Sequence, residues 1–257
     1  MIIILNSSKT LDFQSPPHIS KYSVPEFCDD SKVLVDALRK LTLAGFAELM
    51  GVSEKLAVLN VDRYKNWQVP HSTPAARQAL LAFKGDIYAA IGVENYTTKE
   101  FNFAQKHLRI LSGLYGILRP LDLIQPYRLE MATKLSTQRG KGMYEFWGNR
   151  INQALNAALK QEKSGTLINL ASLEYFKAVK ARLLKAKVVT PVFKEYRDSS
   201  YRVVAIYAKK ARGLMCDYTI RNHLTRVDDL KSFDLDGYRY SAKLSSEAEW
   251  VFTRGKK

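Results

Sequence analysis

The sequence predicts a mixed α+β fold in which a central sheet is flanked by helices. Helical periodicity dominates between residues 31 and 130 and again at 143–160, whereas runs rich in β-branched residues stand at the start of the chain and after residue 165. No Pro-, Gly- or Ser-rich linker divides the 257 residues, so we expect one domain over residues 1–257. The first strand should therefore join strands from the C-terminal half.

The N-terminal half begins with an apolar run at residues 2–5, which predicts a strand that ends in the polar loop 6–10. Thr73–Pro74 indicates a helix start, because Pro is favoured at the first helical position. Thr97 and Glu100 have the spacing of a capping box. A helical stripe is formed by Val33, Leu34, Ala37, Leu38 and Leu41.

Two glycines and a proline interrupt the apolar segment 111–122, which predicts a tight turn between helices. Residues 143–160 then place their apolar side chains on one face, as an amphipathic helix does. We expect a family of strands to follow, joined in part by a hairpin turn at 197–200, and then a helix at 214–224. The expected strands are 167–170, 188–196, 201–208, 237–240 and 250–253.

The charge of the chain is positive and unevenly distributed. The formal net charge is +15, and residues 134–212 hold 17 of the basic side chains against 5 acidic ones. Such a concentration attracts polyanions, although a basic surface can also serve solubility alone. An aromatic content of 11% and a charged fraction of 25% exclude disorder of the whole chain.

Several classes of site are disfavoured by the motifs. The four histidines lack the spacing of paired metal ligands, and no dinucleotide-binding, P-loop or nucleophile-elbow motif occurs. We therefore expect no metal and no cofactor. Cys28 and Cys216 are expected to be ordinary thiols. No apolar run approaches the ~20 residues of a membrane span. We expect a cytoplasmic monomer without membrane contact.

Residues 43–66 have the pattern of two short helices joined by a turn, as in helix–hairpin–helix DNA-binding elements. The helices are expected at 43–50 and 54–66, with Gly51, Val52 and Ser53 in the turn and Lys55 just after it. Backbone N–H groups of such a turn hold a phosphate without reading sequence. A plain corner with a C-terminal glycine cap is the alternative.

The second candidate surface for nucleic acid is the basic tract 177–212, which holds 11 basic and 2 acidic residues near aromatic side chains. A third candidate is Lys9, in a polar loop where backbone N–H groups and one ammonium could hold an anion. The residues expected to bind DNA outside the turn are Lys9, Lys177, Lys180, Lys209, Lys210 and Arg212.

Two other functions remain open at this point. The chain could be an enzyme acting on a nucleobase or a nucleic-acid lesion, with Lys9 or Lys209 as a Schiff-base lysine and Glu174 or Asp86 as its acid–base partner. No catalytic residue is assigned. Iron sequestration is the other alternative, and the absence of clustered ligand-spaced residues disfavours it.

Several long segments resemble the YaaA family of bacterial peroxide stress resistance proteins. They are SSKTLDFQSP (7–16), LAFKGDIY (81–88), FAQKHLRILSGLYGILRPLDLIQPYRLEM (103–131), INLASLEYFKAVK (168–180) and YAKKARGLM (207–215). The resemblance covers essentially the whole length. The chain departs from the family at residues 6–8, where Asn-Ser-Ser replaces the common Ser-Pro-Ala.

The resemblance implies a cytoplasmic protein that supports survival of hydrogen peroxide by limiting free iron and iron-promoted DNA damage. It further implies an uncommon fold with a helix–hairpin–helix element and a positive cleft that binds duplex and branched DNA. Together with the charge pattern, this leads to the prediction of a DNA-binding protein of the oxidative stress response, which contacts phosphates without strong sequence preference.

Overall fold

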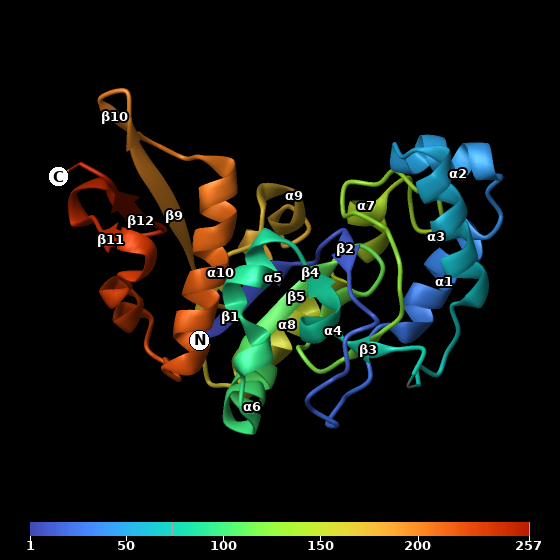
Figure 1. Ribbon diagram of the computed structural model, residues 1–257, viewed down its shortest axis with the longest axis horizontal. Coiled ribbons are helices and arrows are strands. Elements are labelled where there is room, and N and C mark those ends of the chain that lie inside the picture. Colours follow the sequence, from blue (N-terminus) through green and yellow to red (C-terminus); the bar gives the residue numbers. More distant parts are fainter. Residues whose placement is uncertain (73, 257) are drawn as a thin grey trace.

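The computed structural model describes residues 1–72 and 74–256, and its centre is a mostly parallel sheet (Figure 1). The sheet strands are β1 (Ile2–Asn6), β5 (Leu108–Ser112), β6 (Gly116–Leu118), β8 (Thr166–Asn169), β9 (Lys187–Arg197), β10 (Ser200–Arg202), β11 (Arg239–Tyr240) and β12 (Glu249–Arg254). Their order is β11-β12-β9-β8-β1-β5-β6, with β10 paired to β9. The four central pairings are parallel, and β6, β10 and β11 pair antiparallel.

Two short ribbons lie outside this sheet. In the first, β2 (Thr10–Leu11) pairs with β4 (Phe83–Lys84), and in the second, β3 (Arg77–Gln78) pairs with β7 (Leu123–Ile124). The register of the first ribbon sets Thr10 opposite Lys84. This pairing brings residue 84 beside the loop that follows β1.

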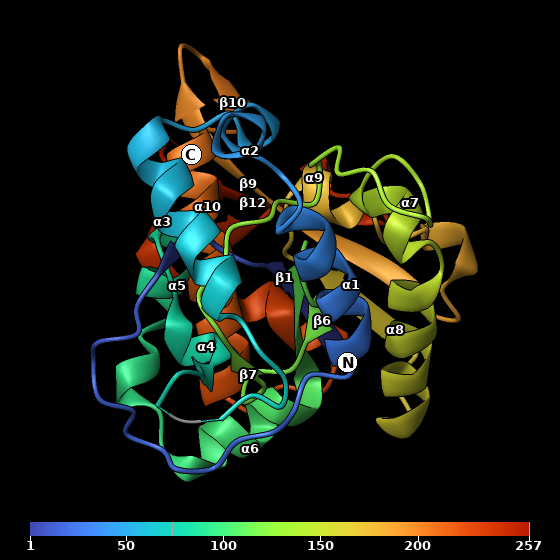
Figure 2. The same cartoon turned by 90° about the vertical axis from the view of Figure 1, so that its right-hand side faces the viewer.

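Helices cover the sheet on both faces (Figure 2). They are α1 (Cys28–Leu38), α2 (Leu43–Met50), α3 (Glu54–Asn66), α4 (Ala79–Ala82), α5 (Asp86–Ile91), α6 (Thr98–His107), α7 (Met143–Trp147), α8 (Arg150–Gln161), α9 (Leu173–Phe176) and α10 (Ala205–Arg221). α5, α6 and α10 pack together against one face, while α8 packs against β6 on the other. α1, α2 and α3 gather at one end of the molecule (Figure 1).

The centre of the core is β1, whose residues 2–5 are buried on both faces, as expected for a parallel strand between two layers of helices. A close approach of α10 to α5 borders this core. A Cβ added at Gly213 of α10 would come within 2.2 Å of the backbone oxygen of Ile87. Gly213 therefore allows the backbones of the two helices to pack together, which fixes α5 relative to α10.

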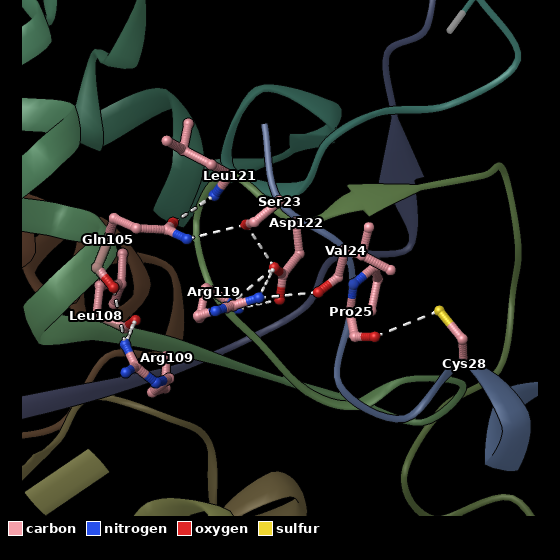
Figure 3. A network of polar contacts seen from close by, with 10 residues as sticks. All are labelled: Ser23, Val24, Pro25, Cys28, Gln105, Leu108, Arg109, Arg119, Leu121 and Asp122. Carbon is pink, nitrogen blue, oxygen red and sulfur yellow. Dashed lines mark hydrogen bonds and ion pairs between the residues drawn. The ribbon is translucent and has the colours of Figure 1, made fainter. Parts of the chain in front are cut away.

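A buried carboxylate anchors the long segment that precedes α1 (Figure 3). Asp122 is 1% exposed and accepts hydrogen bonds from Ser23 Oγ at 2.6 Å and from Arg119 Nε at 3.1 Å. Arg119 Nη2 also donates to the carbonyl of Val24 at 2.8 Å. Burial raises the pKa of Asp122, and the neighbouring Arg119 opposes this rise. The polar groups of this network hydrogen-bond to one another, so the network has a structural role.

Several sequence predictions are confirmed. The first strand, the strand β8 and the last strand pair occur at the expected places, and Asp198 and Ser199 form the tight turn between β9 and β10. Thr97 and Glu100 form both hydrogen bonds of a capping box at the start of α6. The two helices at 43–50 and 54–66 have the expected bounds.

Other predictions are wrong. Residues 111–122 are not a turn between helices, because β5 and β6 form an antiparallel hairpin there. The strand predicted at 201–208 ends at Arg202, and α10 begins at Ala205, so the helix predicted at 214–224 is only the second half of α10.

Two predicted helices also begin or end elsewhere. The helix predicted at 143–160 is divided into α7 and α8 by Gly148, whose φ is +53°. Thr73, the predicted helix cap, lies outside the described residues, and the next helix begins at Ala79. Within residues 1–72 and 74–256, none of the helices combines the length and apolar character needed to cross a bilayer.

Candidate functional site

The sheet topology creates a crevice between β1 and β8. After β1 the chain continues to β5 on one side, whereas after β8 it continues to β9 on the other side. The loops that leave the carboxyl ends of these neighbouring strands therefore diverge. In open α/β sheets, ligands bind at such a topological switch point.

A pocket of about 510 Å³ occupies this crevice, and we call it the switch-point pocket. Residues 6–10, at the end of β1 and directly after it, line one wall, and residues 172, 174 and 175 follow β8 and line another. The remaining lining comes from residues 84–88 on β4 and α5, from Glu130, and from Lys209 and Arg212 on α10. The close packing at Gly213 thus holds two walls of the pocket together.

Hydrogen bonds between buried groups fix the walls. Ser7 Oγ donates to the hydroxyl of Tyr175 at 3.2 Å, and the hydroxyl of Tyr88 donates to the carbonyl of Asn6 at 2.9 Å. The backbone N–H of Ser172 donates to Asn6 Oδ1 at 3.0 Å, so the loops after β1 and β8 are joined directly. Burial raises the pKa of Tyr88 and of Tyr175, which keeps both phenols protonated.

Two of the four cationic side chains in the pocket pair with carboxylates. Lys9 Nζ lies 2.8 Å from Glu130 Oε2, and Lys84 Nζ lies 3.6 Å from Asp12 Oδ2. Glu130 also lies 3.3 Å from Arg128 Nη2, so this carboxylate is shared between two cations. Lys9 remains 59% exposed, and an incoming anion could replace Glu130 as its partner.

The other two cations, Lys209 and Arg212, form no ion pair with any carboxylate of the described residues. Arg212 is half-buried, and its Nη1 and Nε donate to the backbone oxygens of Leu170 at 3.4 Å and Ala208 at 3.2 Å. Burial lowers the pKa of this guanidinium. A partly desolvated guanidinium without a counter-ion favours an anionic ligand, and its planar donors match phosphate.

A second hollow of about 710 Å³ begins at Glu130 and extends toward α2, and we call it the α2 groove. Its walls are the end of α1, the side of α2 and the segment 130–136. Glu130 lines both hollows, so the two adjoin at this residue, and we call them together the cleft.

The turn between α2 and α3 stands beyond the outer end of this cleft. Gly51 ends α2 with a φ of +58°, and the N–H of Val52 donates to the carbonyl of Ala47 at 3.1 Å. Ser53 begins α3, and its side chain makes no capping hydrogen bond. Gly51, Ser53 and Lys55 are all exposed, so the turn is accessible to a partner.

The structure separates the remaining basic residues of the sequence prediction from the pocket. Lys177 Nζ lies 5.0 Å from the ring centroid of Tyr144, and Lys180 Nζ donates to Asn149 Oδ1 at 2.8 Å. Lys210 Nζ lies 3.2 Å from Asp236 Oδ2. Of the predicted cations, the pocket therefore brings together Lys9, Lys209 and Arg212.

Sequence reasoning missed Lys84 and Glu130. Lys84 reaches the pocket through the β2–β4 pairing, and Glu130 lies in an irregular segment, so neither has a local pattern that predicts a site. Both belong to segments quoted for the family resemblance, which was the one available signal.

Lys9 is exposed and ion-paired, and Lys209 is exposed, so neither lysine is desolvated in the way that activates a lysine nucleophile. Within residues 1–72 and 74–256, no group of three or more His, Cys, Asp or Glu side chains lies close enough together to hold a metal ion.

Comparison with known proteins identifies the family. The family described as "Peroxide stress protein YaaA" matches residues 1–244. The chain is 48% identical over 254 residues to a "UPF0246 protein" of Teredinibacter turnerae, with 99% of each chain covered. It is 47% identical over 256 residues to a "UPF0246 protein" of Paraburkholderia phytofirmans, with 99% of this chain and 98% of the relative covered. The chain belongs to the YaaA family of peroxide stress proteins.

Proposed function

We propose that the protein binds DNA through backbone phosphates along the cleft and the turn at Gly51, and that this binding protects DNA from iron-promoted damage during peroxide stress. The observation that carries the proposal is the pair Lys209 and Arg212, two cations of the pocket that form no ion pair with a carboxylate among residues 1–72 and 74–256. Phosphate contacts of this kind position a duplex and carry no sequence information.

The arrangement of charges supports phosphate binding within the switch-point pocket. Lys209 and Arg212 stand one helical turn apart on α10, and Lys84 and Lys9 stand on the neighbouring walls. Lys9 can exchange Glu130 for a phosphate oxygen, because the Lys9 ammonium is 59% exposed and open to an incoming anion. Each phosphate that replaces a carboxylate or water at these cations releases counter-ions from the DNA.

The turn at Gly51 supplies a second contact of a different kind. Its left-handed glycine and the following exposed Ser53 leave the first N–H groups of α3 at the surface. Helix N-termini bind phosphate oxygens through such groups, and Lys55 adds a charge on the first turn of α3. We propose that a DNA strand spans from this turn to the inner pocket.

Two adjacent lysines of α10 provide a matched test. Lys209→Ala and Lys210→Ala remove the same charge from the same helix, but only Lys209 lines the pocket, whereas Lys210 pairs with Asp236. We expect Lys209→Ala to weaken binding of a fluorescein-labelled 25-base-pair duplex by about five- to tenfold, equivalent to roughly 1–1.4 kcal/mol.

Lys210→Ala should bind within about twofold of the wild type under the same conditions. Fluorescence anisotropy at low salt measures both affinities. Equal losses in the two variants would contradict a specific role of the cleft and leave only the general charge of the chain. Absence of duplex binding by the wild type at low salt would refute the proposal.

A further inference from the structure

The most exposed large apolar side chain of the described residues stands beside the switch-point pocket. Leu173, the first residue of α9, is 87% exposed, and its chain neighbours Ser172 and Glu174 both line the pocket. Tyr175 of the same short helix is buried in the pocket wall and hydrogen-bonded to Ser7. A well-fixed support thus holds an apolar side chain in water, where it contributes almost nothing to the core.

The pocket behind Leu173 has the dimensions and mixed character of a site for one nucleotide. Its volume of about 510 Å³ is within the range of small-ligand sites. Ile87, Tyr88 and Tyr175 supply buried apolar surface, and Asp86 and Glu174 supply acceptors for a base edge or a sugar hydroxyl. Lys209 and Arg212 supply donors for the phosphate.

We propose that the switch-point pocket holds one nucleotide displaced from a bound duplex, while Leu173 fills the vacated place in the base stack. DNA-binding proteins insert apolar side chains, leucine among them, between base steps and so unstack them. A displaced nucleotide is then read in a pocket through its polar edge and by contact with aromatic side chains. The inference rests on the proposed DNA binding and names the part of DNA that reaches the pocket.

The energetics predict which duplexes should be favoured. Displacing a paired base costs a few kcal/mol, and a mispaired base costs least. Two 25-base-pair duplexes that differ at one central position provide the comparison. One carries 2-aminopurine opposite thymine and the other carries it opposite cytosine.

We expect the duplex with the mispair to bind about tenfold more tightly, and the emission of its 2-aminopurine to rise as the base leaves the stack. Leu173→Ala should reduce this preference to less than about threefold and leave binding of the paired duplex within about twofold of the wild type. Leu244→Ala, which truncates another exposed leucine on the C-terminal segment, is the matched control and should keep the preference.

A second variant tests the phosphate end of the pocket. Arg212→Gln should lower affinity for the mispaired duplex more than for the paired one, and its melting temperature shows whether it is folded. Leu173 is exposed, so Leu173→Ala should fold like the wild type. The first comparison therefore stands even if Arg212→Gln is unstable.

Equal affinities for the two duplexes with unchanged emission would overturn the inference and leave the proposed DNA binding intact. A preference that Leu173→Ala retains in full would also overturn it. Tight binding of free thymidine monophosphate by a protein that binds neither duplex would refute both the inference and the proposed function. These outcomes separate failure of the nucleotide pocket from failure of DNA binding.

Discussion

At the scale of single residues, the positive charge available in the cleft depends on which cations are paired with carboxylates. Lys209 and Lys210 are consecutive on α10, so their side chains leave the helix about 100° apart. The structure assigns Lys209 to the pocket and Lys210 to Asp236. Asp236 lies in the C-terminal segment, 26 positions further along the chain, so no local pattern could show which lysine it would neutralise.

Buried histidines make the stability of the fold sensitive to acid. His71 is 6% exposed and packs edge-on against the rings of Trp67 and Tyr115. Its Nδ1 lies 2.9 Å from the carbonyl oxygen of Gln68, and its Nε2 has no hydrogen-bond partner among the described residues. Burial lowers the pKa of His71, and the Gln68 carbonyl partly opposes this effect.

A lowered pKa in the folded state means that the unfolded chain binds the proton more readily. His71 therefore adds stability above its unfolded pKa of about 6.5, and this stability is lost as the pH falls below that value toward the folded pKa. We expect the free energy of unfolding to decrease between pH 7 and pH 5. Urea unfolding at the two pH values measures it.

His71→Gln should show a smaller decrease over this interval than the wild type. Some decrease should persist, because burial also lowers the pKa of His107. His223→Gln, which removes an exposed histidine, is the control. An equal decrease in His71→Gln and wild type would show that His71 does not contribute.

At the scale of elements, local patterns predicted the type of most segments and failed where tertiary pairing decides. The hydrophobic pattern of residues 111–122 does not distinguish the end of a helix from a pair of strands. The segment forms strands because β5 pairs with β1 and with β6. Residues 203 and 204 are both valine and extend a β-rich run, yet α10 begins directly after them. The packing of α10 on α5 and β9 outweighs this local preference.

The crossing of α10 and α5 is the element-scale contact on which the pocket depends. Gly213→Ala would place a methyl group 2.2 Å from the backbone oxygen of Ile87, a contact that only a shift of one helix can relieve. We expect the free energy of unfolding to fall by about 1–3 kcal/mol, since this strain outweighs the gain of about 1 kcal/mol in helix propensity.

The same shift should move Lys209 and Arg212 relative to α5, so DNA affinity should fall together with stability. Denaturant unfolding and anisotropy measure the two effects. Gly165→Ala is the control, because a Cβ at Gly165 meets nothing within 4 Å. If Gly213→Ala were as stable as wild type and bound DNA normally, the close crossing would have no structural importance.

At the scale of the whole molecule, the sequence predicted a central sheet flanked by helices, with the first strand among strands of the C-terminal half. It could not predict the strand order, because parallel pairing depends on crossover connections between distant segments. The switch point between β1 and β8 follows from that order. The pocket was therefore invisible in the sequence, although Lys9 and Glu174 beside it were candidates from the ends of their strands.

The charge distribution along the sequence was likewise insufficient to locate the cations of the pocket. The tract 177–212 holds 11 basic residues, but the fold sends Lys177 to Tyr144, Lys180 to Asn149 and Lys210 to Asp236. The sequence thus predicted a basic protein but could not show which of these side chains share one pocket. The four cations of the pocket come from three separate places in the chain: the loop after β1, β4 and α10.

The salt dependence of duplex binding is the decisive test of phosphate recognition in the cleft. Anisotropy titrations of one 25-base-pair duplex between about 50 and 200 mM salt would compare the wild type with the double variant Lys84→Ala/Lys209→Ala. We expect log Kd to rise linearly with log salt, and the slope to fall by about 1.8 in the double variant, since each phosphate neutralised contributes about 0.9. An unchanged slope in the double variant, or binding that does not respond to salt, would contradict phosphate recognition in the cleft.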